Sequence, residues 1–210
     1  TVYQIPMRDD PDNLDRKIYN YQEIAKAIRR VDGVTRAAPL IKSQVMASFG
    51  GNRTGLQVFG ISKGNLMTLP RIAKSNKSIG SISNFNNGIA IGSGVARSLN
   101  ATIGDKVKLV SPDGLKTAFG TSPRVKSYEV VYIFTAGRYD IDKTRVYMPF
   151  SEAQNYFSSS KAADEIEVMV EHPENIEMLK EAIFNAAGTQ SQLWSWRDAS
   201  GNFLRALEIE

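Results

Sequence analysis

The segment from Gly104 to Thr135 constrains the fold of this chain more than any other. Apolar residues alternate with polar ones at both ends of it, from Val107 onward and again up to Phe134. This period of two predicts a pair of half-buried β-strands. Between them, residues 111–124 form an excursion that is far longer than the usual hairpin connection. We therefore expect a hairpin over residues 107–134 whose long loop contacts another molecule.

The same segment has apolar residues at its tip and cations at its base. Leu115 and Phe119 lie in the excursion, and no acid occurs between Asp113 and Glu129. The cations at the base are Lys106, Lys108, Arg124 and Lys126. An apolar tip on a positive base is suited to docking against a partner with an acidic rim. A disordered insertion with a few solvated charges is the alternative that the sequence leaves open.

The composition excludes several other classes of function. The chain has 210 residues, enough for one domain or two small ones. Its formal charge of +4 is spread over 26 basic and 22 acidic residues, which is too dilute to indicate a nucleic-acid partner. Cysteine is absent, so the chain has neither a disulfide framework nor a thiolate metal site. No apolar run reaches the roughly eighteen residues that a membrane-spanning helix needs.

Two β-α-β patterns flank a β-rich middle. The first opens with a strand at residues 1–5 and a helix at about 14–31. The second consists of a strand at 165–171, a helix at 173–188 and a strand at 192–196. We predict an α+β fold in which a split β-α-β subdomain carries a second, β-rich subdomain as an insertion.

The predicted boundaries assign residues 1–61 and 162–210 to the split subdomain and residues 62–161 to the insertion. Because the two flanks must pair with each other, the ends of the chain should lie close together. The chain also begins without Met and stops within a predicted helix at 199–210. We therefore expect an ectodomain that is held between two membrane helices.

Residues suited to catalysis or metal binding are scarce. His172 is the only histidine and precedes a proline at a strand-to-helix junction, where a capping or surface role is favoured over a general base or a ligand. The acidic run at residues 9–15 lacks the turn glycine and the distal Glu of a calcium loop. Gly92 and Gly94 lack the third glycine of a dinucleotide-binding loop and favour a tight turn. We expect no enzyme activity and no cofactor.

Trp194 and Trp196 lie two positions apart at the end of the last predicted strand. In a strand, both side chains would point to the same face of the sheet. Packing in the core is the favoured interpretation, and an apolar ligand surface is the alternative.

Six motifs, in order along the chain, carry a resemblance to a known family. They are GVTRAAPLIKSQVMAS, VFGIS, IAIGSGVARSLNATIGDKVKLVSP, TAFGTSP, VYMPFSEAQNYF and LWSWRDASGNFLRALEIE. Together they resemble the periplasmic domain of the lipoprotein-releasing permeases LolC and LolE and, more widely, the ectodomain of MacB-type ABC transporters. The resemblance covers essentially the whole chain. It implies a Porter-like subdomain with an inserted Sabre-like subdomain, located in the periplasm between two helices of an inner-membrane permease.

The resemblance also implies partners. Permeases of this kind release lipoproteins from the inner membrane and hand them to a LolA-like chaperone. ATP is hydrolysed by a separate LolD-like subunit, and a second permease subunit completes the complex. A protruding hairpin, the Hook, and a basic Pad at its base bind the chaperone.

By position, the Hook would run from Pro112 to Pro123, with Phe119 at its tip. The residues implied to contact the chaperone are Pro112, Leu115, Thr117, Ala118, Phe119, Gly120 and Pro123 of the Hook, with Lys108, Arg124 and Lys126 of the Pad. Phe119 stands where the resemblance leads us to expect Met, and Val125 where it leads us to expect a polar residue.

Two alternatives within the family stay open. One is a LolE-like domain that receives the lipoprotein and does not bind the chaperone. The other is a MacB-like efflux or mechanotransmission ectodomain that contacts an adaptor protein. A stand-alone enzyme is disfavoured because no nucleophile is paired with a base in any pattern of the sequence.

Overall fold

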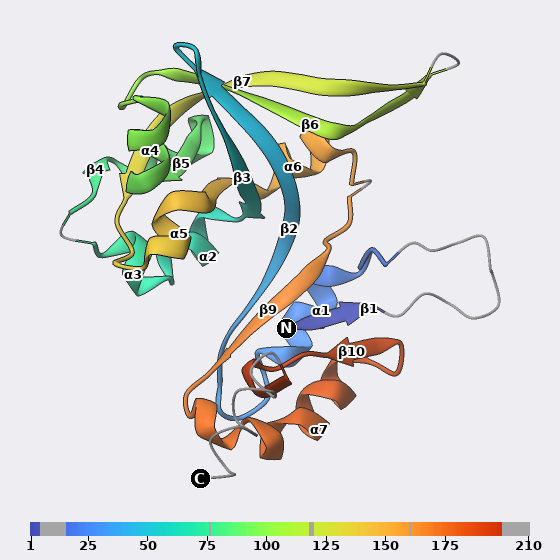
Figure 1. The fold of residues 1–210 in the computed structure, drawn as a ribbon. Helices are drawn as coiled ribbons and strands as arrows, with labels where there is room; N and C mark the ends of the chain where they lie inside the picture. The colour runs from blue at the N-terminus through green and yellow to red at the C-terminus, as the bar shows by residue number, and fades with distance from the viewer. Residues whose placement is uncertain (5–15, 76, 118–119, 160, 199–210) are drawn as a thin grey trace, which may run out of the picture. The chain divides into compact units, whose positions relative to one another are not determined.

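The computed structural model describes residues 1–4, 16–75, 77–117, 120–159 and 161–198. The chain forms two compact units, which Figure 1 shows as ribbons. The first unit comprises Thr1–Pro39 and Ala162–Glu210, and the second comprises Leu40–Lys161. Both units contain helices and strands, so the fold is a mixed α+β fold. In the described ranges, no helix is long and apolar enough to span a membrane.

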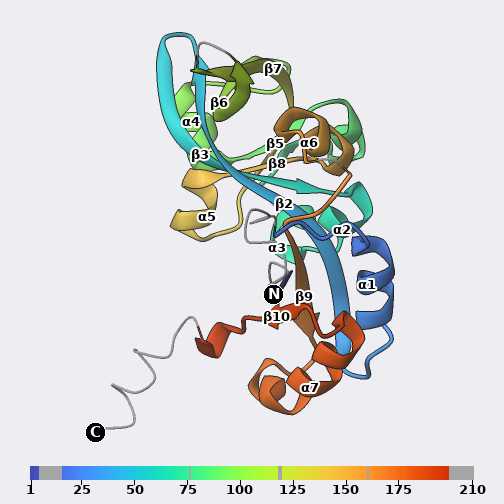
Figure 2. The same ribbon diagram turned by 90° about the vertical axis from the view of Figure 1, so that its right-hand side faces the viewer.

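The first unit is built on a small sheet with β1 (Val2–Gln4) in its interior. β1 lies antiparallel between β9 (Glu165–Val170) and β10 (Ser191–Leu193), and β9 neighbours β2 (Val34–Phe49). The segment that follows β9 forms the short 3-10 helix η2 (Pro173–Asn175) and then α7 (Ile176–Ala187). Figure 2 shows α7 beside β10. The chain's first strand therefore pairs with its last two.

The helix α1 (Tyr21–Ile28) is shorter than the predicted helix at 14–31. Ile18 is not helical because its backbone N–H and C=O are bonded to Ala163, at N···O distances of 2.8 and 3.0 Å. The bridge also buries the Ile18 side chain. A β-bridge to the other flank thus replaces the first helical turns that the sequence pattern indicated.

The second unit contains a mixed sheet in which neighbouring strands are mostly distant in sequence. Its strand order is β2, β3, β8, β5, β7 and β4, and β6 joins β2 and β7. The pairs β3–β8 and β5–β7 are parallel, and the others described in this sheet are antiparallel. The strands are β3 (Asn52–Ile61), β4 (Ile79–Gly80), β5 (Ile89–Gly92), β6 (Lys106–Thr117), β7 (Gly120–Phe134) and β8 (Arg145–Pro149).

Helices cover both faces of this sheet. The helices are α2 (Lys63–Met67), α3 (Pro70–Ala73), η1 (Ile82–Asn87), α4 (Ser93–Leu99), α5 (Tyr139–Thr144) and α6 (Phe150–Phe157). One apolar cluster packs α4 and α6 against the sheet, and a second packs α2, α3 and η1 against it. β5 lies in the middle and is buried along its whole length, as its uninterrupted apolar sequence requires.

The first boundary between the units differs from the predicted one. The units separate at Pro39/Leu40, whereas the sequence pattern placed the boundary after Ile61. β3 pairs with β8 over Gln57–Ile61, and β2 pairs with β6 over Met46–Ser48. These pairings join the β2–β3 hairpin to the inserted unit. The second separation falls at Lys161/Ala162.

The predicted loop from 111 to 124 is also corrected. β6 and β7 stay paired from Lys106↔Glu129 to Thr117↔Gly120, so most of the expected excursion consists of strand. The register shifts between Ser111 and Leu115, where three residues of β6 face the single Pro123 of β7. This bulge accommodates the proline and glycine residues that indicated a loop. The segment is a long β-ribbon.

Candidate docking hairpin

The distal part of the β6–β7 hairpin projects from its unit. β2 pairs with β6 only over residues 108–110. Beyond that point, residues 111–117 and 120–124, which we call the distal ribbon, pair only with each other among the described strands. Figure 1 shows this ribbon extending past the rest of the sheet. Both of its edges expose unpaired backbone groups, and a lone two-stranded ribbon is marginally stable.

The base of the hairpin has an apolar row on its outer face, the face that α6 does not cover. Met46 lies directly opposite Val110, and Val110 lies directly opposite Val125. Residues paired in this way point to the same face of a sheet. Met46 and Val125 are 47% and 57% exposed. Met46, Val110 and Val125, which we call the apolar row, thus form a continuous apolar strip across three strands.

A basic row runs beside the apolar row. Lys108 pairs with Ser48 on one side and with Ser127 on the other, and Ser48 pairs with Arg53. Lys108 and Arg53 are exposed, and neither forms an ion pair within the part of the chain that the structure describes. The outer face therefore presents apolar and cationic side chains next to each other.

The opposite, inner face of the hairpin base is occupied by α6. The Lys126 Nζ lies 2.7 Å from the Glu152 Oε1, and the Tyr128 hydroxyl donates to the same oxygen at 2.8 Å. Burial raises the pKa of Tyr128, and the hydrogen bond to the Glu152 carboxylate raises it further. Arg124 donates to the Tyr156 carbonyl at 2.9 Å and to the Ser158 hydroxyl.

Tyr156 of α6 adds further contacts between the helix and the inner face of the hairpin. Its hydroxyl is within hydrogen-bonding distance of the Leu109 and Arg124 carbonyl oxygens, at 3.0 and 3.1 Å, so it donates across both arms of the hairpin. Its ring makes an edge contact with Tyr128, with centroids 5.7 Å apart. Burial raises the pKa of Tyr156, which keeps the hydroxyl protonated as a donor. The inner face fixes the hairpin, and the outer face is open to a partner.

Comparisons with known proteins agree with this architecture. A model of the MacB-like periplasmic core domain matches residues 1–186. The chain belongs to this family. It is a MacB-like periplasmic core domain, in agreement with the resemblance to LolC and MacB.

The relatives of this MacB-like domain include a transmembrane protein of a lipoprotein-releasing system. Over 202 residues, it is 23% identical to the lipoprotein-releasing system transmembrane protein LolC of Neisseria meningitidis serogroup B. The match covers 94% of this chain but 48% of that protein, so the chain spans about half the length of the curated relative.

Two solved structures share the fold of the MacB-like domain. One is the extracellular domain of the noncanonic ABC-type transporter YknZ from Gram-positive bacteria, with a TM-score of 0.59, 14% identity and coverage of 92% of this chain and 98% of that chain. The other is the periplasmic region of MacB from Actinobacillus actinomycetemcomitans, with a TM-score of 0.59, 11% identity and coverage of 100% and 92%.

The structure separates the three predicted Pad cations of this MacB-like domain. Lys108 lies on the outer face, whereas Arg124 and Lys126 lie on the inner face and contact α6. Lys108 pairs with Ser127, which follows Lys126 directly in β7, and successive residues of a strand point to opposite faces. Sequence reasoning missed Met46 and Arg53, which become neighbours of the hairpin only through the pairing of β2 with β6 and β3.

The predicted Hook residues that the structure describes fall in the distal ribbon. Pro112 and Pro123 are exposed at the bulge. Leu115 pairs with Ser122, and Thr117 pairs with Gly120. The remaining two predicted contacts, Ala118 and Phe119, lie outside the described residues.

In the described ranges, no group of three or more His, Asp or Glu side chains is placed to hold a metal ion. His172 is exposed and its Nδ1 lies 3.2 Å from the Glu174 Oε1. β5 ends at Gly92 and α4 begins at Ser93, so the predicted tight strand-to-helix turn is present. Glycine is required at positions 92 and 94 because a Cβ there would clash with the Asp142 backbone of α5.

Proposed function

We propose that this MacB-like domain belongs to an inner-membrane permease that releases lipoproteins and hands them to a LolA-like periplasmic chaperone. Two findings support the proposal. The lipoprotein-releasing system transmembrane protein LolC of Neisseria meningitidis aligns along 94% of the chain. The β6–β7 hairpin projects with an open outer face at its base. In this proposal the distal ribbon enters the chaperone, and the apolar row and Lys108 contact the rim.

The observation that carries the proposal is the adjacency of the apolar row and the basic row. Exposed apolar side chains in the middle of a contact supply most of the binding free energy. Cations beside them accelerate encounter with an acidic rim and orient the partner. A small contact of this kind gives the modest affinity that suits a transient handover.

The wider complex is part of the same proposal. A LolD-like ATPase and a second permease subunit would assemble with the membrane-embedded part of the protein. The lipoprotein would be the cargo. The domain itself would take no part in ATP hydrolysis.

The fold likeness to MacB favours a second candidate equally, an efflux or mechanotransmission ectodomain that contacts an adaptor protein. A LolE-like domain that receives the lipoprotein without binding the chaperone is a third. Chaperone binding by the hairpin discriminates among the three candidates, because only the lipoprotein-handover function requires a soluble chaperone to bind its outer face and tip.

A binding titration tests the proposal. The 210-residue chain is mixed with a purified LolA-type chaperone, and the wild type is compared with Val125→Asp and Phe119→Asp. We expect both variants to lose at least about tenfold in affinity, because a carboxylate would replace an apolar contact. The matched control is Ile79→Asp, which places the same charge at an exposed apolar position of β4.

The control should bind like the wild type. Binding that is equal in all four proteins would overturn the assignment of the hairpin. No binding of the wild type would favour the adaptor-contacting or lipoprotein-receiving alternatives.

A further inference from the structure

The first unit contains a groove that the docking hairpin does not involve. It lies between β9, β10 and α7 and has a volume of ≈ 550 Å³. Most of its lining is apolar: Val168, Met169, Val170, Ile176, Ile183 and Leu193. A groove of this size is within the range of small-molecule and lipid sites.

Two tryptophans border the groove, and they are the chain's only two. Trp194 is 48% exposed and Trp196 is 46% exposed, so the predicted packing of both in the core is wrong. β10 ends at Leu193, before the first of them, so the alternation of a strand does not continue through this segment. The alternative interpretation, an apolar ligand surface, fits their exposure.

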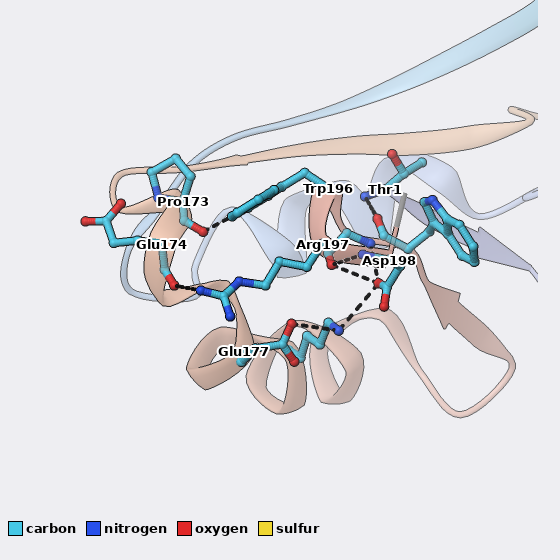
Figure 3. Close-up of polar contacts among 10 residues, drawn as sticks. Thr1, Pro173, Glu174, Glu177, Trp196, Arg197 and Asp198 are labelled. Atoms are coloured by element: carbon cyan, nitrogen blue, oxygen red, sulfur yellow. Dashed lines mark hydrogen bonds and ion pairs between the residues drawn. The ribbon is translucent and has the colours of Figure 1, made fainter. Parts of the chain in front are cut away.

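Hydrogen bonds hold the segment that carries these rings. The Trp194 backbone N–H donates to the Thr1 carbonyl at 2.9 Å. The Trp196 Nε1–H donates to the Pro173 carbonyl at 3.0 Å, and Figure 3 shows this indole extending from the 194–198 segment toward Pro173. Because the Trp196 indole N–H is already paired, this residue adds an apolar ring face to the groove and no free donor of its own.

The other polar groups beside the groove are also paired internally. The Asp198 carboxylate accepts from the Ser195 N–H at 2.7 Å and the Ser195 hydroxyl at 2.8 Å, and these bonds lower the pKa of Asp198. The Lys180 Nζ lies 3.0 Å from Glu177 and 3.4 Å from Asp198, and the bond to Glu177 is the main cause of its raised pKa. A sugar or a nucleotide would find few partners here, whereas an alkyl chain needs none.

One cation beside the groove has no acidic partner. The Arg197 guanidinium lies 5.4 Å from the centre of the Trp196 ring and donates to the neutral Glu174 carbonyl at 3.0 Å. It forms no ion pair within the residues that the structure describes. Its remaining N–H groups can bind a phosphate.

We propose that this groove binds one acyl chain of an anionic membrane phospholipid, with the phosphate group at Arg197. The inference rests on the location of the domain at the inner membrane. Tryptophans beside arginine and lysine are typical of protein surfaces at the level of lipid headgroups. The chain would lie on the apolar lining and against the two indole rings.

Fluorescence quenching tests this proposal directly. Since both tryptophans border the groove, the intrinsic tryptophan fluorescence of the 210-residue chain reports on this site alone. The solved extracellular and periplasmic regions of relatives indicate that such domains fold by themselves. The probe is a vesicle of phosphatidylglycerol whose acyl chains carry bromine, a contact quencher, and unbrominated vesicles are the reference. We expect quenching only by the brominated lipid, and its absence would overturn the proposal.

A pair of variants on α7 separates groove binding from adsorption to the vesicle surface. Ile176→Glu puts a carboxylate into the groove at the first residue of α7, where the helix dipole tolerates an acid. Met178→Glu adds the same charge to the same helix at a position that is 81% exposed and does not line the groove. We expect the first to weaken lipid binding at least about tenfold and the second to leave it unchanged. Equal quenching in both variants would contradict a groove site.

Arg197→Gln tests whether the lipid phosphate binds at Arg197. It should reduce the preference for phosphatidylglycerol over phosphatidylcholine by roughly threefold to tenfold. An unchanged preference would contradict that assignment. Val125→Asp should be quenched like the wild type, so loss of chaperone binding and loss of lipid binding are distinguishable outcomes.

Discussion

The two faces of the β6–β7 hairpin consist of alternating residues of the same strands, and they have opposite environments. On the inner face, Arg124 and Lys126 bind groups of α6, and Tyr128 is buried. On the outer face, Val125 and Lys108 are exposed. The difference teaches that a cation beside a protruding hairpin is not by itself a docking residue. Because successive residues of a strand point to opposite faces, the position of the cation along the strand determines whether it contacts α6 or faces a partner.

The largest effect expected is on the inner face, at Tyr156. Tyr156→Ala removes a buried ring and the hydroxyl that bonds both hairpin arms. We expect it to lower the free energy of unfolding by about 3–5 kcal/mol, measured by urea denaturation of the 210-residue chain. The control Tyr139→Ala alters an exposed ring of α5 and should change stability by no more than about 1 kcal/mol. Equal effects of the two changes would show that α6 does not brace the hairpin.

A second, smaller effect is expected in the distal ribbon. A Cβ on Gly114 would clash with the Ser122 carbonyl, so Gly114→Ala should disrupt pairing beyond the bulge. We expect a loss of roughly 1–3 kcal/mol that is confined to the ribbon. Hydrogen exchange should therefore accelerate at Leu115 and Ser122 and not in β5. Gly55→Ala is the matched control, because a Cβ there meets no atom within 4 Å.

Removal of the Tyr128 hydroxyl should lower the free energy of unfolding by a smaller amount. Tyr128→Phe removes its hydrogen bond to Glu152, which costs about 1 kcal/mol at neutral pH. The raised pKa adds a pH dependence. The unfolded chain releases this proton near pH 10 and the folded chain does so only at higher pH, so this contribution to stability is complete below pH 10 and is lost above it.

Unfolding free energies measured from pH 8 to 11 check this prediction. The wild type should lose stability above about pH 10 more steeply than Tyr128→Phe. Parallel curves would mean that Tyr128 titrates freely in the folded protein.

The smallest effects concern the lysines of the two faces. Lys126→Gln breaks a partly exposed ion pair with Glu152 and should cost at most about 1 kcal/mol of stability. Lys108→Gln should leave stability unchanged and slow association with the chaperone by roughly twofold to threefold at low salt, with no effect at high salt. Stopped-flow mixing at two salt concentrations measures the rate. A slower rate with Lys126→Gln alone would reverse the assignment of the faces.

The sequence pattern could predict the strands of the hairpin and their alternation. Val107 and Tyr128 are buried, as their apolar positions required. The length of the loop could not be predicted, because Pro112, Gly114 and Pro123 are typical of loops and are accommodated here by a bulge between paired strands. Local residue preferences do not reveal that β6 and β7 continue to pair on both sides of the bulge.

The sequence alone could not predict which side chains lie together on the outer face, for a different reason. Met46 and Arg53 are each more than fifty residues away from Val110 and Lys108 in the sequence and join them only through sheet pairing. The sequence pattern favours a core position for Trp194 and Trp196 because it predicts a strand that includes them, whereas β10 ends at Leu193. In both cases, the missing information is which strands pair and where a strand ends.

The most direct measurement of the central claim is the affinity of the chaperone for Val125→Asp and for Lys126→Asp. The two positions are adjacent in β7, both side chains are more than half exposed, and both variants gain one carboxylate. We expect Val125→Asp to lose at least about tenfold in affinity and Lys126→Asp, once its folding is verified by circular dichroism, to lose less than about threefold. A larger loss at Lys126 than at Val125 would contradict docking through the outer face.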